Sequence, residues 1–130
     1  MKEIQELQDE YNKLCVKLGL KGQFKVNPQN DGASHVEFNN NTYYYIKTDR
    51  GVEFVKKITV DKDEILYWLI SEVIWKYSLQ YELEHRIDGQ DARRIRFNKE
   101  IELFNQINID WSNKRNREIE AILEINPYTQ

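Results

Sequence analysis

The stretch "DKDEILYWLISEVIWKY", residues 61–77, decides the fold. Asp61 and Glu64 have the spacing of a capping box and place negative charge where a helix begins. Between Ile65 and Trp75, almost every side of that helix is apolar. A helix that is apolar all round is normally covered on several sides. The sequence therefore predicts one long central helix against which the rest of the chain packs.

The residues before this helix predict an N-terminal helix and a short antiparallel β-meander. Apolar residues first recur in helical steps, at Ile4, Leu7, Tyr11, Leu14 and Leu18, and Gly19 and Gly22 end that pattern. The period then changes to two in "HVEF" (35–38), "TYYYIKT" (42–48) and "VEFVKKITV" (52–60). Turn-forming residues lie at 30–32, 39–41 and 49–51. In the third strand, alternation assigns one face to Val52, Phe54, Lys56 and Ile58.

Two more helices are expected after the central one. Gly89 interrupts the helical pattern, and a helix from about Ala92 presents Phe97, Ile101, Phe104 and Ile107 on one face. The last helix carries Ile119, Ile122 and Leu123, ends at "NPY" (126–128), and follows Trp111, which we expect to plug the core. The order of N-terminal helix, meander and three helices indicates an α+β fold, and we expect a single domain over residues 1–130.

Composition and charge exclude several classes of protein. Residues 1–60 hold 9 Lys and Arg against 8 Asp and Glu, and residues 61–130 hold 10 against 14, which gives the net charge of −3. This distribution lacks the basic stripe that nucleic acid requires, whereas a mildly acidic half suits a basic protein partner. No signal peptide opens the sequence, and no apolar stretch approaches the roughly 20 residues that cross a bilayer. The single cysteine, Cys15, excludes an internal disulfide. From these observations together, we expect a cytoplasmic protein with no nucleic-acid partner and no membrane partner.

The segment "YELEHRIDGQDARR", residues 81–94, holds the candidate functional residues, which are Glu82, His85, Arg86, Asp91, Arg93 and Arg94. One hypothesis is a small metal-dependent or acid–base hydrolase centred on Glu82 and His85. This E-x-x-H pair has the i, i+3 spacing of di-iron bundles, but those sites need a second pair and two more glutamates. As an acid–base couple it would need an anionic substrate held by the arginines, and no nucleophile motif, phosphate loop or cofactor fingerprint accompanies it. We expect no cofactor.

The other hypotheses for this segment are a structural charge cluster and a surface that binds a partner. Glu82 and Arg86 are spaced as an i, i+4 ion pair. Asp91 is placed to accept from the amides of Arg93 or Arg94 at the start of the third helix, and both arginines are expected to reach back to Glu82 or Glu84. A network of this kind would fix how two helices pack.

A resemblance adds a function to these patterns. "HRI" (85–87), "QD" (90–91) followed by "RR" (93–94), "KEIEL" (99–103) and "NPY" (126–128) resemble a family of small bacterial immunity proteins, family sixty-three of those assigned to polymorphic toxin systems. Genes of this family lie beside toxin genes. The resemblance implies an immunity protein that binds and neutralises a cognate toxin, is not an enzyme, and has no catalytic or metal residues to carry over.

Overall fold

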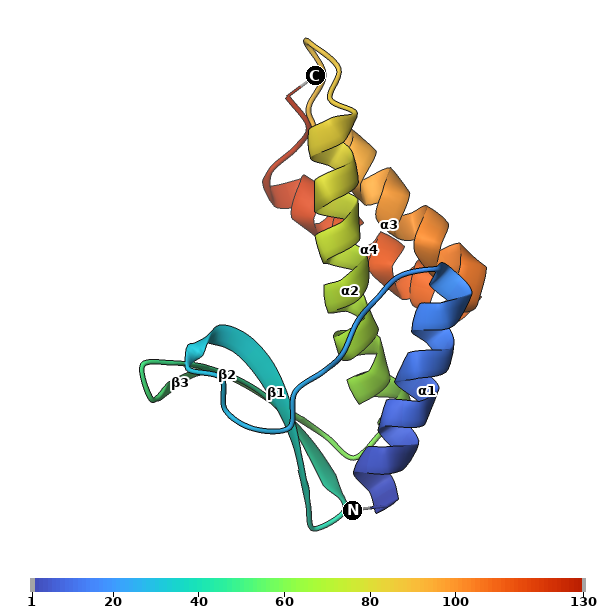
Figure 1. The fold of residues 1–130 in the computed structure, drawn as a ribbon. Helices are drawn as coiled ribbons and strands as arrows, with labels where there is room; N and C mark the ends of the chain where they lie inside the picture. Colours follow the sequence, from blue (N-terminus) through green and yellow to red (C-terminus); the bar gives the residue numbers. More distant parts are fainter. Residues whose placement is uncertain (1, 130) are drawn as a thin grey trace. The chain divides into compact units, whose positions relative to one another are not determined.

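The computed structural model describes residues 2–129 and confirms the α+β fold class (Figure 1). The chain divides into two compact units. The sheet unit contains residues up to Val16 and Lys21–Ile70, and the helical unit contains Lys17–Leu20 and residues from Ser71 onward. The expectation of a single domain stays a prediction. In chain order the elements are α1 (Lys2–Leu18), β1 (Asp31–Asn39), β2 (Thr42–Asp49), β3 (Val52–Thr59), α2 (Lys62–Glu84), α3 (Arg93–Ile107) and α4 (Ile109–Ile125).

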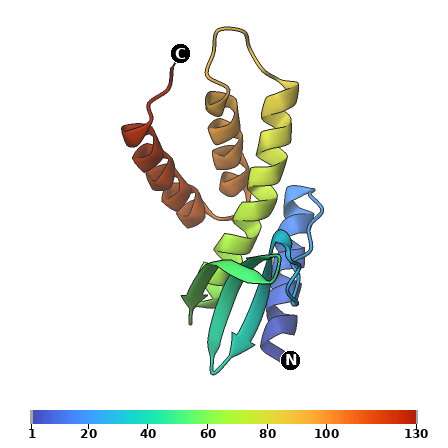
Figure 2. The same cartoon turned by 90° about the vertical axis from the view of Figure 1, so that its left-hand side faces the viewer.

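The three strands form one antiparallel sheet in the order β1-β2-β3, as the meander predicts (Figure 2). Two-residue turns join them, and all four turn residues have positive φ: Asn40 (52°) and Asn41 (56°), then Arg50 (52°) and Gly51 (79°). Such turns match the right-handed twist of the strands they connect. Asparagine and glycine adopt this conformation readily, whereas Arg50 does so at a cost.

The predicted alternation of β3 is wrong at one end of the strand. Lys47 of β2 is paired with Val55, but the next residue, Thr48, is paired with Glu53. Phe54 is therefore an extra residue in β3, a bulge that breaks the regular alternation of faces. Val52 and Phe54 consequently do not continue the alternation of Lys56 and Ile58.

Aromatic side chains hold the sheet unit together. The rings of Tyr45 and Trp68 lie edge to face at 6.0 Å, and the ammonium of Lys57 lies 4.6 Å from the Trp68 ring centroid. The Tyr11 ring of α1 meets Phe24 edge to face at 5.2 Å. The free thiol of Cys15 on α1 is buried, which raises its pKa.

The central helix begins as predicted, because the Asp61 carboxylate accepts from the amide of Asp63 at 2.9 Å. Its apolar segment is buried at Ile65, Leu66, Tyr67, Leu69, Ile70 and Ile74. Trp75 departs from this pattern and is 47 % exposed. No helix within residues 2–129 combines the length and hydropathy needed to cross a membrane.

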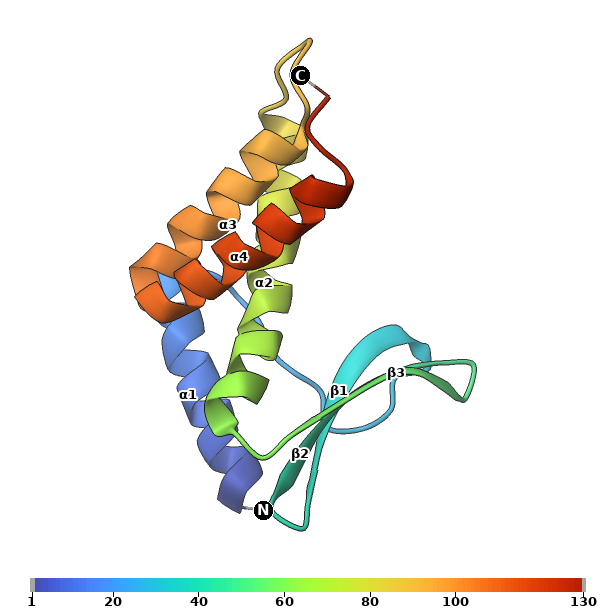
Figure 3. The same cartoon turned by 180° about the vertical axis from the view of Figure 1, so that it is seen from behind.

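In the helical unit, the second half of α2 is followed by α3 and α4, and Asn108 alone separates the last two helices (Figure 3). The Asn108 side chain accepts from the amide of Trp111 at 3.1 Å and caps α4. Trp111 is buried as predicted, but it lies inside α4 and not before it. The short cap gives no break in hydropathy, which is why the predicted helix starts too late.

Candidate functional site

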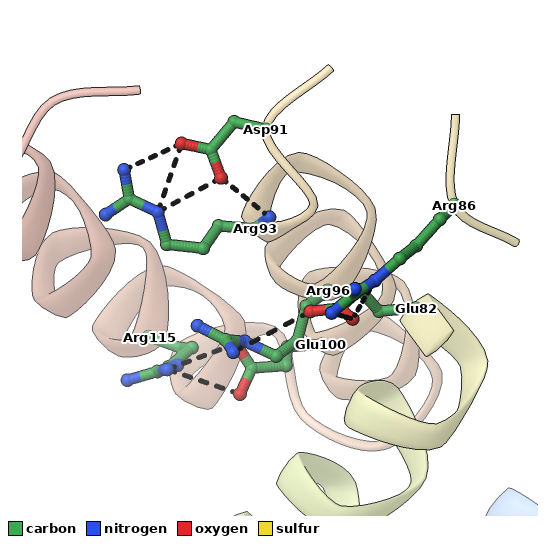
Figure 4. A network of polar contacts seen from close by, with 7 residues as sticks. All are labelled: Glu82, Arg86, Asp91, Arg93, Arg96, Glu100 and Arg115. Atoms are coloured by element: carbon green, nitrogen blue, oxygen red, sulfur yellow. Dashed lines mark hydrogen bonds and ion pairs between the residues drawn. The ribbon is translucent and has the colours of Figure 1, made fainter. Parts of the chain in front are cut away.

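The six candidate residues all belong to the helical unit, where five of them fall into two groups and His85 lies apart. Figure 4 shows four of these five, Glu82, Arg86, Asp91 and Arg93. Glu82 and Arg86 belong to a charge network around the two buried carboxylates of Glu82 and Glu100, which we define as Glu82, Arg86, Arg96, Glu100, Arg115 and Glu118. Asp91, Arg93 and Arg94 contact the end of the chain and form what we call the C-terminal anchor.

Glu82 is the point where α2 joins the charge network. Its side chain is 4 % exposed, and Arg86 donates to its Oε2 atom from Nε at 3.1 Å and from Nη2 at 3.0 Å. The predicted i, i+4 pair is therefore present. On the other side of the same carboxylate, Nη1 of Arg96 in α3 lies 3.9 Å from Oε1. Glu82 thus lies between two guanidinium groups from different parts of the unit.

The network continues to two residues that the sequence did not single out. Glu100 of α3 is 3 % exposed, and Nη2 of Arg115 in α4 donates to both of its carboxylate oxygens at 3.2 and 3.1 Å. Arg115 also donates from Nη1 to Glu118 at 3.2 Å. The order Arg86, Glu82, Arg96, Glu100, Arg115, Glu118 alternates in sign and connects α2, α3 and α4.

Burial sets the protonation behaviour of the Glu100–Arg115 pair. Burial raises the pKa of Glu100 above its ordinary value of 4.5, even though Arg115 and Arg96 act in the opposite direction. For Arg115, burial acts against the charged form, but the attraction of Glu100 and Glu118 still raises the pKa of the guanidinium. The fold therefore makes an isolated charge at this position costly and a paired charge acceptable.

The C-terminal anchor joins the start of α3 to the residues after α4. The carboxylate of Asp91 accepts from the Arg93 amide at 3.0 Å, from its guanidinium at 2.8 Å, and from the amide of Thr129 at 3.1 Å. Arg93 in turn donates to the carbonyls of Asn126 and Pro127, both at 2.9 Å. A cation at these carbonyls complements the negative end of α4.

The structure tests the partners that the sequence predicts for Arg93 and Arg94. The predicted acceptance of the Arg93 amide by Asp91 is confirmed. The predicted partner of Arg93 is wrong, since its guanidinium forks onto Asp91 and not onto Glu82. Arg94 lies with its guanidinium carbon 4.0 Å from the centroid of the Tyr128 ring, a cation–π contact that holds "NPY" in place.

Hydrogen bonds also set the pKa values in the anchor. The Arg93 side chain first, and then the backbone amides of Arg93 and Thr129, hold the pKa of the Asp91 carboxyl well below its usual range. Asp91 raises the pKa of Arg93 in return. Both groups are therefore charged at neutral pH, so the anchor is an ion pair under these conditions.

His85 lies apart from both groups. It follows the last residue of α2, and its ring is stacked on that of Tyr81 with centroids 4.0 Å apart. Its Nδ1 atom is 2.8 Å from the Tyr81 carbonyl, and because a carbonyl can only accept, Nδ1 carries the proton. The contacts that engage Glu82 come from Arg86 and Arg96, so the structure does not join Glu82 and His85 into the predicted couple.

These contacts limit what the candidate residues can do chemically. A general base must reach the substrate proton, and the carboxylate of Glu82 is buried between two arginines. Within residues 2–129, no group of three or more His, Cys, Asp or Glu side chains is placed to hold a metal ion. The arrangement instead fits the role of fixing how three helices pack.

Comparison with known proteins identifies a family. A family model described as Immunity protein 63 matches residues 39–121, from the end of β1 into α4. No curated protein matches the chain. No solved structure matches it either.

Proposed function

The chain belongs to the Immunity protein 63 family, and on this premise we propose that it binds and neutralises one cognate bacterial toxin without catalysing a reaction. The family match over residues 39–121 is the observation that carries the proposal. We place this activity in the cytoplasm, with the toxin as the partner and no nucleic acid or membrane involved.

The geometry of the helical unit supports binding over catalysis. The two buried carboxylates of its charge network are each paired with an arginine, Glu82 with Arg86 and Glu100 with Arg115. Groups held in this way stabilise a rigid surface and are poor proton carriers. A protein that acts by occupying its target needs such a preformed surface more than it needs reactive groups.

Co-expression with the toxin domain encoded beside the gene tests the proposal. Bacteria that produce the toxin domain should resume growth when this chain is present, and the two purified proteins should elute together. A toxin domain of unrelated sequence is the control and should not be neutralised. Arrested growth with both proteins well expressed would refute the proposal.

Titration separates binding from catalysis. An inhibitor that occupies its target must be present in at least the molar amount of the toxin, so residual toxin activity should fall linearly to an equivalence point. An enzyme that modified the toxin would abolish its activity at a small fraction of that amount. The latter result would revive the hydrolase centred on Glu82 and His85.

A further inference from the structure

β3 is an edge strand of the sheet that is open to solvent, in contrast to β1 at the other edge. Residues 34–36 of β1 are buried, and the amide of Val36 donates to the carbonyl of Lys25 at 2.8 Å, which covers part of that edge. In β3, Val52, Phe54 and Ile58 are 64 %, 54 % and 56 % exposed. The bulge takes Phe54 out of the alternation that Ile58 follows, so these side chains flank the open edge and do not form one face of the sheet. Three large exposed apolar side chains along one open edge indicate a contact surface.

The backbone of β3 offers hydrogen bonds as well as apolar surface. Among the described residues, the strand pairs with β2 on one side and with no strand on the other. Along such an edge, unpaired N–H and C=O groups form a template for another strand. Peptides that extend a sheet gain affinity from these backbone groups and specificity from the side chains beside them.

Charge indicates which strand the edge accepts. β3 carries two basic residues against one acidic one, Lys56 and Lys57 against Glu53, and Arg50 precedes the strand in its turn. Opposite charges across a strand pair stabilise it, and like charges destabilise it. The edge therefore favours a strand with Asp or Glu.

A second copy of this chain fits the edge less well. The centre of β3 lies between Val55 and Lys56. An antiparallel pair formed by two copies has a two-fold axis near that centre. With the axis at Lys56, the two Lys56 side chains lie directly opposite each other, and their repulsion disfavours that pairing.

We propose that β3 is the docking edge for an acidic, extended segment of the toxin, which adds to the sheet as a fourth strand and packs its apolar side chains on Phe54 and Ile58. This inference rests on the proposed function and names the surface and the partner chemistry through which it operates. The segment pairs with the backbone of β3, and its carboxylates lie beside Lys56.

Affinity measurements with the purified toxin domain encoded beside the gene, in an inactive form, test the surface. The double variant Phe54→Thr/Ile58→Thr keeps strand-forming residues and should bind about tenfold more weakly or worse. The matched control is Ile109→Thr, which removes an equally exposed apolar side chain from α4 and should bind as the wild type does.

Lys56→Glu should weaken binding, whereas Lys13→Glu on the exposed face of α1 should not. Amides of residues 52–59 should exchange more slowly in the complex.

The outcomes separate this inference from the function on which it rests. If the wild type neither binds nor neutralises the toxin domain, the proposed function fails and the docking edge fails with it. If the wild type binds and the double variant binds equally well, only the docking edge is wrong. If Lys56→Glu binds the toxin domain more tightly than the wild type, the proposal that the docking segment is acidic is wrong. A concentration-dependent dimer that the double variant abolishes would assign the edge to a second copy and overturn the proposal.

Discussion

In β3, the apolar residues Val52, Phe54 and Ile58 face solvent, whereas in α3 and α4 the charged residues Glu100 and Arg115 lie in the interior. Each region reverses the usual distribution of side chains. The buried charges have partners in their own unit, so we propose that they fix how the helices pack. The exposed apolar side chains have no comparable explanation within the sheet, which is why we assign binding to β3 and architecture to the helices.

Replacing Arg115 with methionine should give the largest loss of stability. The change leaves Glu100 buried without its forked partner, and breaking a buried pair in this way costs about 3–5 kcal/mol. Denaturant unfolding at neutral pH measures the loss. Arg117→Met on the exposed side of the same helix is the control and should change little. Equal effects for the two variants would mean that the interior charge pair has no special role.

Asp91→Asn should give the next largest loss, because one carboxylate serves both Arg93 and Thr129. The pKa of Asp91 is lower in the folded protein than its ordinary value of 3.8. Its contribution to stability is therefore present above pH 3.8 and is lost as the pH falls through the pKa of the folded state. The difference between wild type and variant should therefore shrink on acidification below pH 4, as denaturant unfolding across pH would show. Asp110→Asn, at an exposed position, is the control. A difference that grows in acid would contradict the pairing.

Glu100→Gln should show the opposite pH dependence. At pH 7 it should lower the free energy of unfolding by about 1 kcal/mol or less, because the amide oxygen still accepts a hydrogen bond from Arg115. The pKa of Glu100 is raised in the fold. The contribution of Glu100 to stability is therefore fully present below pH 4.5, and it is lost as the pH rises through the pKa of the folded state. The wild type should therefore exceed the variant most clearly in acid, as unfolding curves from pH 4 to pH 8 would show. The same slope as for Asp91→Asn would mean that burial does not control Glu100.

Local signals in the sequence predict much of the fold. The Asp61 cap, the change of period beyond Phe24 and the turns at residues 39–41 and 49–51 each depend on neighbours in the chain. The bulge at Phe54 escaped prediction because strand register is set by the partner strand.

The candidate site was harder to predict, because its partners lie far apart in the chain. Asp91 meets Thr129, and Glu100 meets Arg115, through packing that periodicity does not describe. A signal for the second pair does exist. Glu100 lies three residues after Phe97 on the core face of α3, and Arg115 lies four residues after the buried Trp111. A charge at a core position of each of two neighbouring helices predicts an internal ion pair.

Arg50→Asn should stabilise the sheet unit by about 0.5–1 kcal/mol, because asparagine adopts the positive φ of this turn more readily. Arg50→Ala is the control, since it removes the charge but keeps an unfavourable β-carbon. Amide exchange in both units measures the effect and also tests the predicted single domain. One cooperative domain would show the gain in α3 and α4 as well as in the strands. An equal gain in Arg50→Ala would assign it to charge and not to the backbone.

Phe54→Thr should have the smallest effect on stability, within about 0.5 kcal/mol, because the side chain is exposed and threonine suits a strand. Phe104→Thr in α3 is the matched control and should cost about 3–5 kcal/mol, because that ring is buried. Denaturant unfolding of the free protein measures both. Comparable losses would mean that another part of the chain covers Phe54 in solution, and the edge would then be closed to a partner. If only Phe104→Thr loses stability, the ring of Phe54 is not needed for folding and is free to contact a partner. Its contribution is then measured as affinity in the complex.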